Sequence, residues 1–283
     1  MSNSMKGKVC IVTGANSGIG KATALELAKL DARIVMLCRD KSRGEEAQSE
    51  IITESGNEAV YLLLANLSSQ QSIREFITEF QMNYDKLHVL INNAGVNPSK
   101  RYETVDGLEK TFAINTLAPF LLTNLLLPIL KKSVSARVVN VVSAVHSKTI
   151  NFENLQFKKH FRSWKAYSQS KTALILLTYE FARRLSGTGI TVNCLHPGAV
   201  KSNITRDYRG VIKLFTKLFF SFAKSPEEGA ETSIYLASSP EVEMLSGKYF
   251  IDKKETKSKD ITYNMSIAER LWNICADLTN FTI

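Results

Sequence analysis

The sequence lacks the features that mark secreted, membrane-spanning and metal-binding proteins. Its 283 residues include four cysteines, which show neither close pairing nor metal-ligand spacing: Cys10, Cys38, Cys194 and Cys275. Three of them lie in apolar, strand-like runs, so we expect reduced core residues of a cytosolic protein. The segment Met1–Lys8 has no apolar stretch of the kind that forms a signal peptide. The longest oily run, APFLLTNLLLPIL, has 13 residues, fewer than the ~20 that cross a bilayer.

Internal repeats, low-complexity linkers and nucleic-acid-binding motifs are also absent from the sequence. Hydrophobic residues make up 44% of the chain and charged residues 22%, an ordinary globular composition that allows one large core. The net charge is +9, and basic residues gather in residues 158–165, 201–224 and 248–259. Because no nucleic-acid motif accompanies this charge, we interpret it as a solvated lysine-rich surface. Such a surface would also attract anionic ligands or lipid headgroups.

The chain does contain a regular alternation of apolar, strand-like runs and helix-period segments. The strand-like runs are rich in Val, Ile and Leu on both faces: KVCIVTG, ARIVMLC, AVYLLLANL, KLHVLINNAG, ARVVNVVS and GITVNCLHPG. The helix-period segments are Gly18–Leu30, Ser42–Ser55, Ser69–Tyr84, Gly107–Lys132 and Trp164–Ser186. This order predicts an α/β fold, a single-domain Rossmann-type doubly wound parallel sheet with helices on both faces. We expect the site at the carboxyl ends of the strands, where ligands of such sheets bind.

A glycine-rich turn, TGANSGIG, follows the first strand. Gly14, Gly18 and Gly20 permit a tight turn and a helix whose N-terminus points at an anion. The spacing is G-x-x-x-G-x-G rather than the common G-x-G-x-x-G. Three glycines in seven residues are more than an ordinary connection needs, so the turn predicts a phosphate site.

The second strand ends in MLCRD, where dinucleotide sites meet the adenosine ribose. An acidic residue there binds a 2′-hydroxyl, whereas an arginine accommodates a 2′-phosphate. Cys38 takes the acidic place here and Arg39 follows it. This favours phosphate binding by Arg39 over an exposed arginine paired with Asp40, and Lys41 and Arg43 could assist.

Tyr167 and Lys171 of KAYSQSK lie four residues apart, where a helix is expected to begin. Positions i and i+4 share one helix face, so the Lys171 ammonium would approach the Tyr167 phenol. A nearby positive charge favours the ionised phenol and should bring the Tyr167 pKa below its usual ~10. An isolated Y-x-x-x-K is more often a chance surface pair, so the other motifs must decide.

Together these motifs resemble the short-chain dehydrogenase/reductase family. TGANSGIG, NNAG, the Asn of INTLAPF, the Ser of VVSAVHS, YSQSK and HPGAVKS occur in the family's order, from Lys8 to about Gly247. Within the family the chain is most similar to the retinol dehydrogenase group, on LCRD, HVLINNAGV, the 24-residue gap from Ser143 to Tyr167, FARRLSGTGITVNCLHPG and AERLWNICADL. The resemblance implies NADP(H)-dependent interconversion of a lipophilic alcohol and its aldehyde or ketone.

The resemblance also implies roles for individual residues. Tyr167 would donate or accept the proton, and Lys171 would hold the nicotinamide ribose and lower the Tyr167 pKa. Ser143 would bond the substrate oxygen, and Asn115 would anchor a water that leads from Lys171 to solvent. The cofactor would contact Tyr167 and Lys171, and also Gly14, Ser17, Gly18, Ile19, Gly20, Arg39, Asn66, Leu67, Asn93, Ala94, Gly95, Pro197, Gly198, Val200 and Ser202.

Two positions depart from the family pattern, and the histidines add no metal site. Asn66 stands where an aspartate commonly meets the adenine, and its amide carbonyl could still accept that hydrogen bond. Asp31 replaces the glycine that usually closes the first helix. The four histidines lack metal spacing and are interpreted as structural, with His146 the nearest to the substrate pocket: His88, His146, His160 and His196.

The substrate is expected to meet two aromatic-rich segments, residues 151–167 and a lid at about 201–225. Apolar side chains such as Phe215, Phe219 and Phe220 suit a lipophilic carbonyl. Packing on the body or on a second subunit stays open, as does shallow membrane contact. The lid would follow a dinucleotide-binding core at about 8–200, and a C-terminal tail at about 252–283 would complete the single domain.

We therefore expect a cytoplasmic NADP(H)-dependent oxidoreductase that acts on a small lipophilic alcohol or carbonyl. A peripheral membrane location is the alternative, a homodimer is left open, and no nucleic acid or metal is expected to bind. The alternative function is a catalytically silent NADP(H)-binding regulator on the same fold. The presence of all four catalytic candidates, Asn115, Ser143, Tyr167 and Lys171, argues against it.

Overall fold

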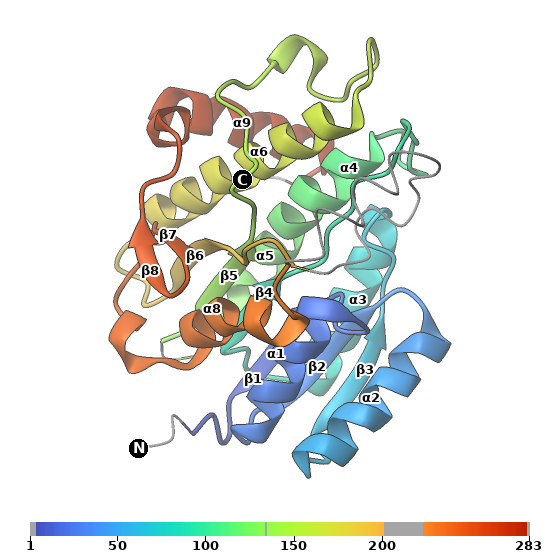
Figure 1. Ribbon diagram of the computed structural model, residues 1–283, viewed down its shortest axis with the longest axis vertical. Helices are drawn as coiled ribbons and strands as arrows, with labels where there is room; N and C mark the ends of the chain where they lie inside the picture. The colour runs from blue at the N-terminus through green and yellow to red at the C-terminus, as the bar shows by residue number, and fades with distance from the viewer. Residues whose placement is uncertain (1–3, 134, 201–222, 282–283) are drawn as a thin grey trace.

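A single eight-stranded sheet forms the centre of the computed structural model, which describes residues 4–133, 135–200 and 223–281 (Figure 1). Its strand order is β3-β2-β1-β4-β5-β6-β7-β8, and every neighbouring pair is parallel except β7 and β8. The strands are β1 (Val9–Thr13), β2 (Arg33–Cys38), β3 (Val60–Leu64), β4 (Val89–Asn92), β5 (Arg137–Val141), β6 (Thr191–His196), β7 (Tyr249–Ile251) and β8 (Lys254–Thr256). The predicted doubly wound α/β fold is confirmed, with its strand order reversing between β1 and β4.

Helices cover both faces of this sheet because its strands carry apolar side chains on both sides. In β1, Val9 and Ile11 join one hydrophobic core, and Cys10 and Val12 join the other, as the two-residue period of a strand requires. One face is covered by α1 (Gly18–Lys29), α2 (Lys41–Ser55) and α8 (Pro226–Ser238), and the other by α3 (Gln70–Asn83), α5 (Ala118–Leu130) and α6 (Ser163–Arg184).

The long apolar run of the sequence lies in a buried core helix. α4 (Lys110–Phe112), η1 (Ala113–Leu117) and α5 form one continuous helical stretch, close to the predicted Gly107–Lys132. With its 21 residues it is the one helix of the described ranges that is long and apolar enough to cross a membrane. Because 83% of its most apolar window is buried inside the protein, packing in the core accounts for that composition.

The C-terminal tail belongs to the packed core. After the β7–β8 hairpin, η6 (Asp260–Tyr263) leads into α9 (Met265–Leu278), which lies beside α6 (Figure 1). The Trp272 ring of α9 meets Phe120 of α5 and Phe181 of α6 edge to face, with centroids 4.9 and 4.6 Å apart. α9 therefore covers the shared outer face of α5 and α6.

Three local expectations can be compared with the structure. β3 is the edge of the sheet, where Tyr61 is 43% and Leu64 41% exposed, so its interpretation as a strand buried on both faces is wrong. Asp31 closes α1 with a left-handed φ of +66°, as expected. All four cysteines are buried and unpaired, as a reduced core requires.

Candidate active site

The glycine-rich turn lies directly against the carboxyl end of β1. Gly14 has a φ of +67°, a left-handed conformation that glycine adopts without strain. At Gly20, in the first turn of α1, a Cβ would lie 2.4 Å from both the Gly14 carbonyl oxygen and Asn93 Nδ2. The Ser17 side chain makes no capping hydrogen bond to α1, so the first amides of this helix are available to a phosphate.

The NNAG segment fixes the end of β4 to the end of β1. The amides of Asn93 and Ala94 both donate to Thr13 Oγ1 at 2.9 Å, and Asn93 Nδ2 donates to the Thr13 carbonyl at 2.8 Å. A Cβ at Gly95 would lie 3.5 Å from both Asn115 Oδ1 and Lys171 Nζ. The strand end thus carries predicted cofactor residues on one side and reaches the predicted catalytic residues on the other.

Arg39 is exposed at the end of β2, and it makes no ion pair or hydrogen bond with any described residue. Asp40 instead caps α2, accepting from the Arg43 amide at 3.0 Å, so the alternative of an Arg39–Asp40 pair is not observed. Cys38 is buried, and its thiol receives backbone hydrogen bonds from Ala15 and Asn16. Burial raises the pKa of this thiol to about 11. Arg39 is therefore available to an anionic ligand at this edge, as is the exposed Arg43 side chain, which likewise makes no ion pair with a described residue.

Asn66 is already engaged within its own loop. Its Oδ1 accepts from the Ser68 amide at 3.1 Å and from the Ser68 hydroxyl at 2.7 Å. The expected acceptor for the adenine amino group therefore has its lone pairs in use. Leu67 follows it, partly buried against the core below α3.

Ser143, Tyr167 and Lys171 meet beside the carboxyl end of β5. Tyr167 and Lys171 lie one turn apart on α6, and Ser143 follows β5 by two residues. The three residues are only 7, 8 and 3% exposed. The Ser143 hydroxyl hydrogen-bonds the Tyr167 phenol. Lys171 Nζ donates to the Val141 carbonyl at 2.8 Å and lies 5.8 Å from the Tyr167 ring centroid.

Burial sets the protonation of this group. It raises the pKa of Tyr167 to about 12, against the smaller lowering effect of the Ser143 hydrogen bond. It also lowers the pKa of Lys171 to about 8. The expectation that Lys171 brings the Tyr167 pKa below its usual value is not met in the chain by itself, because desolvation of both groups outweighs their proximity.

Asn115 occupies a π-helical turn between α4 and α5. Its Oδ1 accepts from the Val96 amide at 2.8 Å, and its Nδ2 donates to the Val96 carbonyl and to Ser170 Oγ, each at 3.0 Å. Ser170 precedes Lys171 and donates to the Tyr167 carbonyl at 2.7 Å. The Asn115 side chain therefore joins the segment after β4 to the catalytic face of α6, which helps to explain the π-turn at this place.

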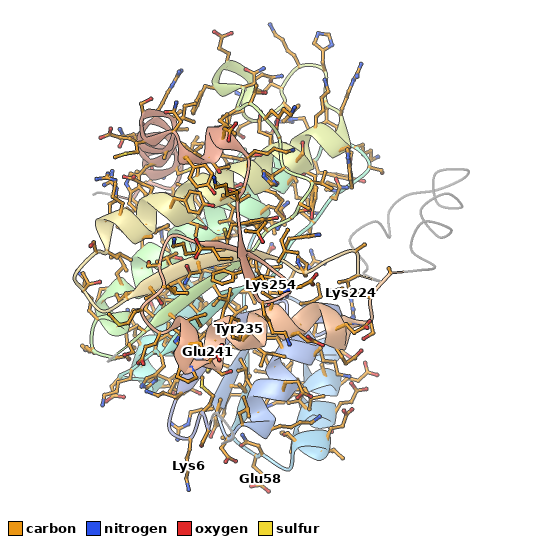
Figure 2. The ribbon with its side chains drawn as sticks, turned by 60° about the vertical axis from the view of Figure 1, so that its left-hand side comes forward. Lys6, Glu58, Lys224, Tyr235, Glu241 and Lys254 are labelled. Atoms are coloured by element: carbon orange, nitrogen blue, oxygen red, sulfur yellow. The ribbon has the colours of Figure 1, made fainter. Side chains whose placement is uncertain are left out.

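The loop after β6 pairs with the segment that leads into α8. Gly198 has a φ of +87°, and a Cβ there would approach Lys224 at 2.9 Å. Val200 is buried, and it pairs with Lys224 (labelled in Figure 2), whose ammonium bonds Asp252 at 2.6 Å. Pro197 precedes this turn, whereas Ser202, Phe215, Phe219, Phe220 and most of the predicted lid lie outside the described residues.

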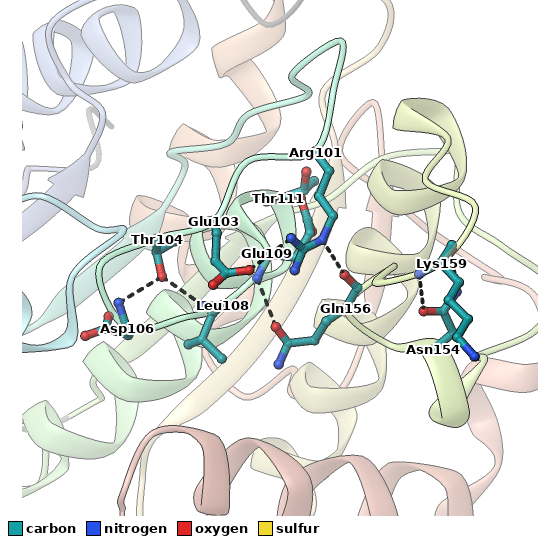
Figure 3. A network of polar contacts seen from close by, with 10 residues as sticks. All are labelled: Arg101, Glu103, Thr104, Asp106, Leu108, Glu109, Thr111, Asn154, Gln156 and Lys159. Carbon is teal, nitrogen blue, oxygen red and sulfur yellow. Dashed lines mark hydrogen bonds and ion pairs between the residues drawn. The ribbon is translucent and has the colours of Figure 1, made fainter.

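A rim of polar contacts joins the segment after β4 to the segment before α6 (Figure 3). Gln156 accepts from Arg101 Nε through its carbonyl at 3.3 Å and from the Glu109 amide through Oε1 at 2.9 Å. Burial raises the pKa of the Glu109 carboxyl through loss of solvent, against the lowering effect of the hydrogen bonds by which it caps α4. Beside this rim, Trp164 is 54% exposed and stacks on Tyr167 with centroids 5.6 Å apart.

The histidines show no metal centre. Within residues 4–133, 135–200 and 223–281, no group of three His, Cys, Asp or Glu side chains is placed to hold an ion. His146 is buried beside Ser143, with its Nδ1 2.9 Å from the Ser143 carbonyl.

Comparison with known proteins agrees with this geometry. A family model described as short chain dehydrogenase matches residues 8–211. The chain belongs to the short-chain dehydrogenase family. Its relatives include retinol dehydrogenase 12 of Mus musculus, 46% identical over 96% of this chain and 86% of that protein. Polyprenol dehydrogenase of Homo sapiens is 41% identical over 96% of this chain and 85% of that protein. The Pseudomonas aeruginosa RhlG/NADP active-site complex superposes with a TM-score of 0.71, at 28% identity over 88% of this chain and 96% of that one.

Membership of the short-chain dehydrogenase family makes this chain an oxidoreductase that interconverts alcohols and carbonyl compounds. Sequence reasoning did not find Ser170 or Gln156. Ser170 lies within YSQSK, a small polar residue that could have been noted. Gln156 gives no local signal, because its partners are 47 and 55 residues away in the chain.

Proposed function

We propose that this chain is an NADP(H)-dependent oxidoreductase that interconverts a lipophilic alcohol with its aldehyde or ketone. The observation that carries the proposal is the buried contact between the Ser143 hydroxyl and the Tyr167 phenol, one helical turn from the buried Lys171 ammonium. Such an arrangement holds a proton donor against a second hydroxyl where solvent is excluded. It is the arrangement that protonation of a carbonyl oxygen requires as hydride reaches the carbonyl carbon.

The nicotinamide cofactor, when bound, supplies the hydride. The Tyr167 phenol would donate the proton to the substrate oxygen, since its pKa of about 12 keeps it protonated at neutral pH. Ser143 would hydrogen-bond the same oxygen and stabilise the charge that develops on it. Lys171 would hold the ribose, and Asn115 would keep α6 in register with the end of β4. The silent-regulator alternative has no observation in its favour, because none of these groups is missing.

The residues present fit a dinucleotide phosphate. Gly14 and Gly20 leave backbone where side chains would intrude, and the first amides of α1 are uncapped by Ser17. Arg39 is exposed without a described partner, which supports a contact to a 2′-phosphate. We infer a preference for NADPH, with the remaining predicted contacts at the ends of β3, β4 and β6.

Cofactor choice is tested by steady-state kinetics with NADPH and NADH. A charge-assisted contact of about 1.5–3 kcal/mol gives wild type a roughly 10- to 150-fold preference for NADPH in kcat/KM. In C38D/R39A the new carboxylate would accept the backbone hydrogen bonds from Ala15 and Asn16 and would repel a 2′-phosphate. The variant should therefore prefer NADH over NADPH. Equal use of both cofactors by wild type would show that Arg39 is only a surface arginine.

The lipophilic substrate class rests on the relatives' names and on Trp164. Retinol and polyprenol, named in two relatives, are both long isoprenoid alcohols. The exposed Trp164 ring beside Tyr167 offers such a chain an aromatic surface. The test is NADPH oxidation with straight-chain aldehydes of increasing length and with all-trans-retinal. We expect kcat/KM to rise with length by up to ~0.8 kcal/mol per buried methylene. A flat profile would remove the lipophilic part of the proposal.

Location and assembly also remain proposals. The unpaired buried cysteines favour a reducing compartment, and the net charge of +9 would support peripheral contact with an anionic membrane. Co-sedimentation with neutral and anionic vesicles distinguishes a cytoplasmic protein from a peripheral one. Analytical ultracentrifugation measures whether the chain is a monomer or a homodimer. The proposed one-domain organisation predicts a single unfolding transition.

A further inference from the structure

His146 links the loop that carries Ser143 to the C-terminal region of the chain. Its ring is 6% exposed, three residues after Ser143. Nδ1 lies 2.9 Å from the Ser143 carbonyl oxygen, and Nε2 accepts from the Lys259 amide at 3.1 Å. Lys259 immediately precedes η6 and is 113 residues away in the chain. A second contact, from Lys259 Nζ to the His146 carbonyl, repeats the link.

These bonds assign the tautomer of His146. A backbone amide can only donate, so Nε2 must be the unprotonated nitrogen. Nδ1 then carries the proton and donates it to the Ser143 carbonyl. The ring is therefore neutral. Burial and the neighbouring Lys259 charge also favour the neutral ring, because both lower the His146 pKa. Its remaining neighbours are the Tyr249 ring, 5.8 Å away, and the imidazole of His196.

The same loop is attached to α6 on its other side. The Ser147 amide donates to Thr172 Oγ1 at 2.6 Å and approaches the Ser168 carbonyl at 3.3 Å. Both partners lie within one or two turns of Tyr167 on that helix. The Ser143 side chain is held in turn by the Val145 amide, which donates to Ser143 Oγ at 3.0 Å and leaves the hydroxyl proton for other acceptors. Ser143 thus sits in a loop fixed at one end to the proton donor's helix.

We propose that His146 is a positioning residue for Ser143, acting as a neutral imidazole that anchors the Ser143 backbone to the segment preceding η6. The inference rests on the proposed function, since it assigns the anchor to the hydroxyl that meets the substrate oxygen. Without the imidazole the Ser143 carbonyl loses its donor, and the loop keeps only its bonds to α6 and the contact from Lys259 Nζ to the His146 carbonyl. The hydroxyl would then lose its fixed place against Tyr167.

A double-mutant cycle tests whether His146 acts through Ser143. His146→Phe keeps a buried ring beside Tyr249 but removes both bonds, and kcat should fall about 10- to 100-fold, because a misplacement of ~1 Å can cost that much. The KM for NADPH should stay within about twofold, since no cofactor contact changes. In the S143A background, His146→Phe should cost nothing further. Full additivity of the two losses would overturn the proposal.

Two further variants separate positioning from general destabilisation. His146→Asn retains a donor at the Nδ1 position and loses the Lys259 bond, so kcat should lie between wild type and His146→Phe. His88→Phe is the matched control, because His88 Nδ1 accepts from the Val9 amide at 3.0 Å at the amino end of β1, away from the strand ends that carry the catalytic residues. It should lower stability and leave kcat unchanged. An equal loss of kcat in both Phe variants would refute a positioning role.

Amide hydrogen exchange measures how firmly His146 holds the Ser143 loop, and it does not require an active enzyme. Peptides that cover residues 143–147 and the Lys259 amide should exchange faster in His146→Phe than in wild type or His88→Phe. Unchanged exchange in both peptides would refute the anchor, whatever the kinetics show. If wild type oxidises NADPH with none of the aldehydes, the proposed function fails, and the exchange data still decide whether His146 holds this loop.

Discussion

The two halves of the sheet's carboxyl edge present polar groups in different ways. At β1 and β2 the available groups are backbone amides around Gly14 and Gly20, together with the exposed Arg39. At β5 and α6 they are side chains that are buried and shifted in pKa, Tyr167 and Lys171 above all. We call the region at β1 and β2 the cofactor half, which leaves space for a ligand beside the backbone. The region at β5 and α6 is the catalytic half, which excludes solvent from its side chains. Substitutions in the cofactor half should alter the shape of the site and therefore cofactor affinity. Substitutions in the catalytic half should alter protonation and therefore the rate of turnover.

Removing the Tyr167 hydroxyl should give the largest effect. Tyr167→Phe keeps the ring stacked on Trp164 but deletes the proton donor, so kcat should fall by at least about 10²–10⁴-fold. Cofactor affinity, measured by NADPH fluorescence, should remain near wild type, because Lys171 and the groups around Gly14, Gly20 and Arg39 are unchanged. Turnover close to that of wild type in Tyr167→Phe would place the proton donor elsewhere.

How far the sequence predicts this molecule differs between the same two regions. The five predicted helices agree with the structure to within three residues at either end, the fourth of them spanning α4, η1 and α5, because each has an apolar period and a clear boundary signal. The glycine turn and the Tyr167–Lys171 spacing are local patterns, and both lie where they were expected. The direction of the Tyr167 pKa shift was not predicted, because burial depends on how α6, β5 and the Ser143 loop pack together.

Contacts between segments that are distant in the chain could not be predicted from the sequence either. The Lys259 amide that meets His146 lies in a tail whose sequence gave no indication of its position. The π-turn at Asn115 interrupts a segment whose period is that of an ordinary helix, and its reason is a contact with Val96 and Ser170. Such features follow from tertiary packing, which a single sequence does not reveal.

Replacing Lys171 should separate stability from activity in the catalytic half. Burial lowers its pKa from 10.5 to about 8, so the unfolded chain binds the proton more tightly than the folded one. Below pH 8 this cost is present in full, and it is lost as the pH rises toward 10.5. Lys171→Met should therefore raise the free energy of unfolding at pH 7 by about 1–3 kcal/mol, while turnover falls sharply.

Urea unfolding of wild type and Lys171→Met at pH 7 and pH 10 measures this gain, which should shrink at the higher pH. Lys165→Met, an exposed lysine on the same helix, is the matched control and should change stability by less than about 0.5 kcal/mol. If Lys171→Met is the less stable protein at pH 7, the bond from Lys171 Nζ to the Val141 carbonyl outweighs the cost of burial.

In the cofactor half, a single methyl group should be enough to weaken binding. At Gly20 a Cβ would lie 2.4 Å from the Gly14 carbonyl and from Asn93 Nδ2, which is itself bonded to Thr13. Neither neighbour can move without displacing the turn, and overpacking of this kind costs about 1–3 kcal/mol. Since the free variant relieves this cost by displacing the turn and NADPH binding must restore it, NADPH affinity should fall roughly 5- to 150-fold. Gly20→Ala should show this loss in a fluorescence titration, with kcat at saturating NADPH reduced far less.

Gly44→Ala provides the comparison that isolates the cause. Gly44 is also a helical glycine, in α2, and its Cβ would lie 2.8 Å from the terminal methyl groups of Leu62. Those methyls belong to a flexible, half-buried side chain, so they can rotate away, and alanine is favoured over glycine in a helix by about 0.5–1 kcal/mol. We therefore expect Gly44→Ala to leave NADPH affinity unchanged and to keep or raise stability. Equal NADPH affinity in Gly20→Ala and Gly44→Ala would mean that the glycine turn tolerates a side chain, and the space it leaves would no longer explain cofactor binding.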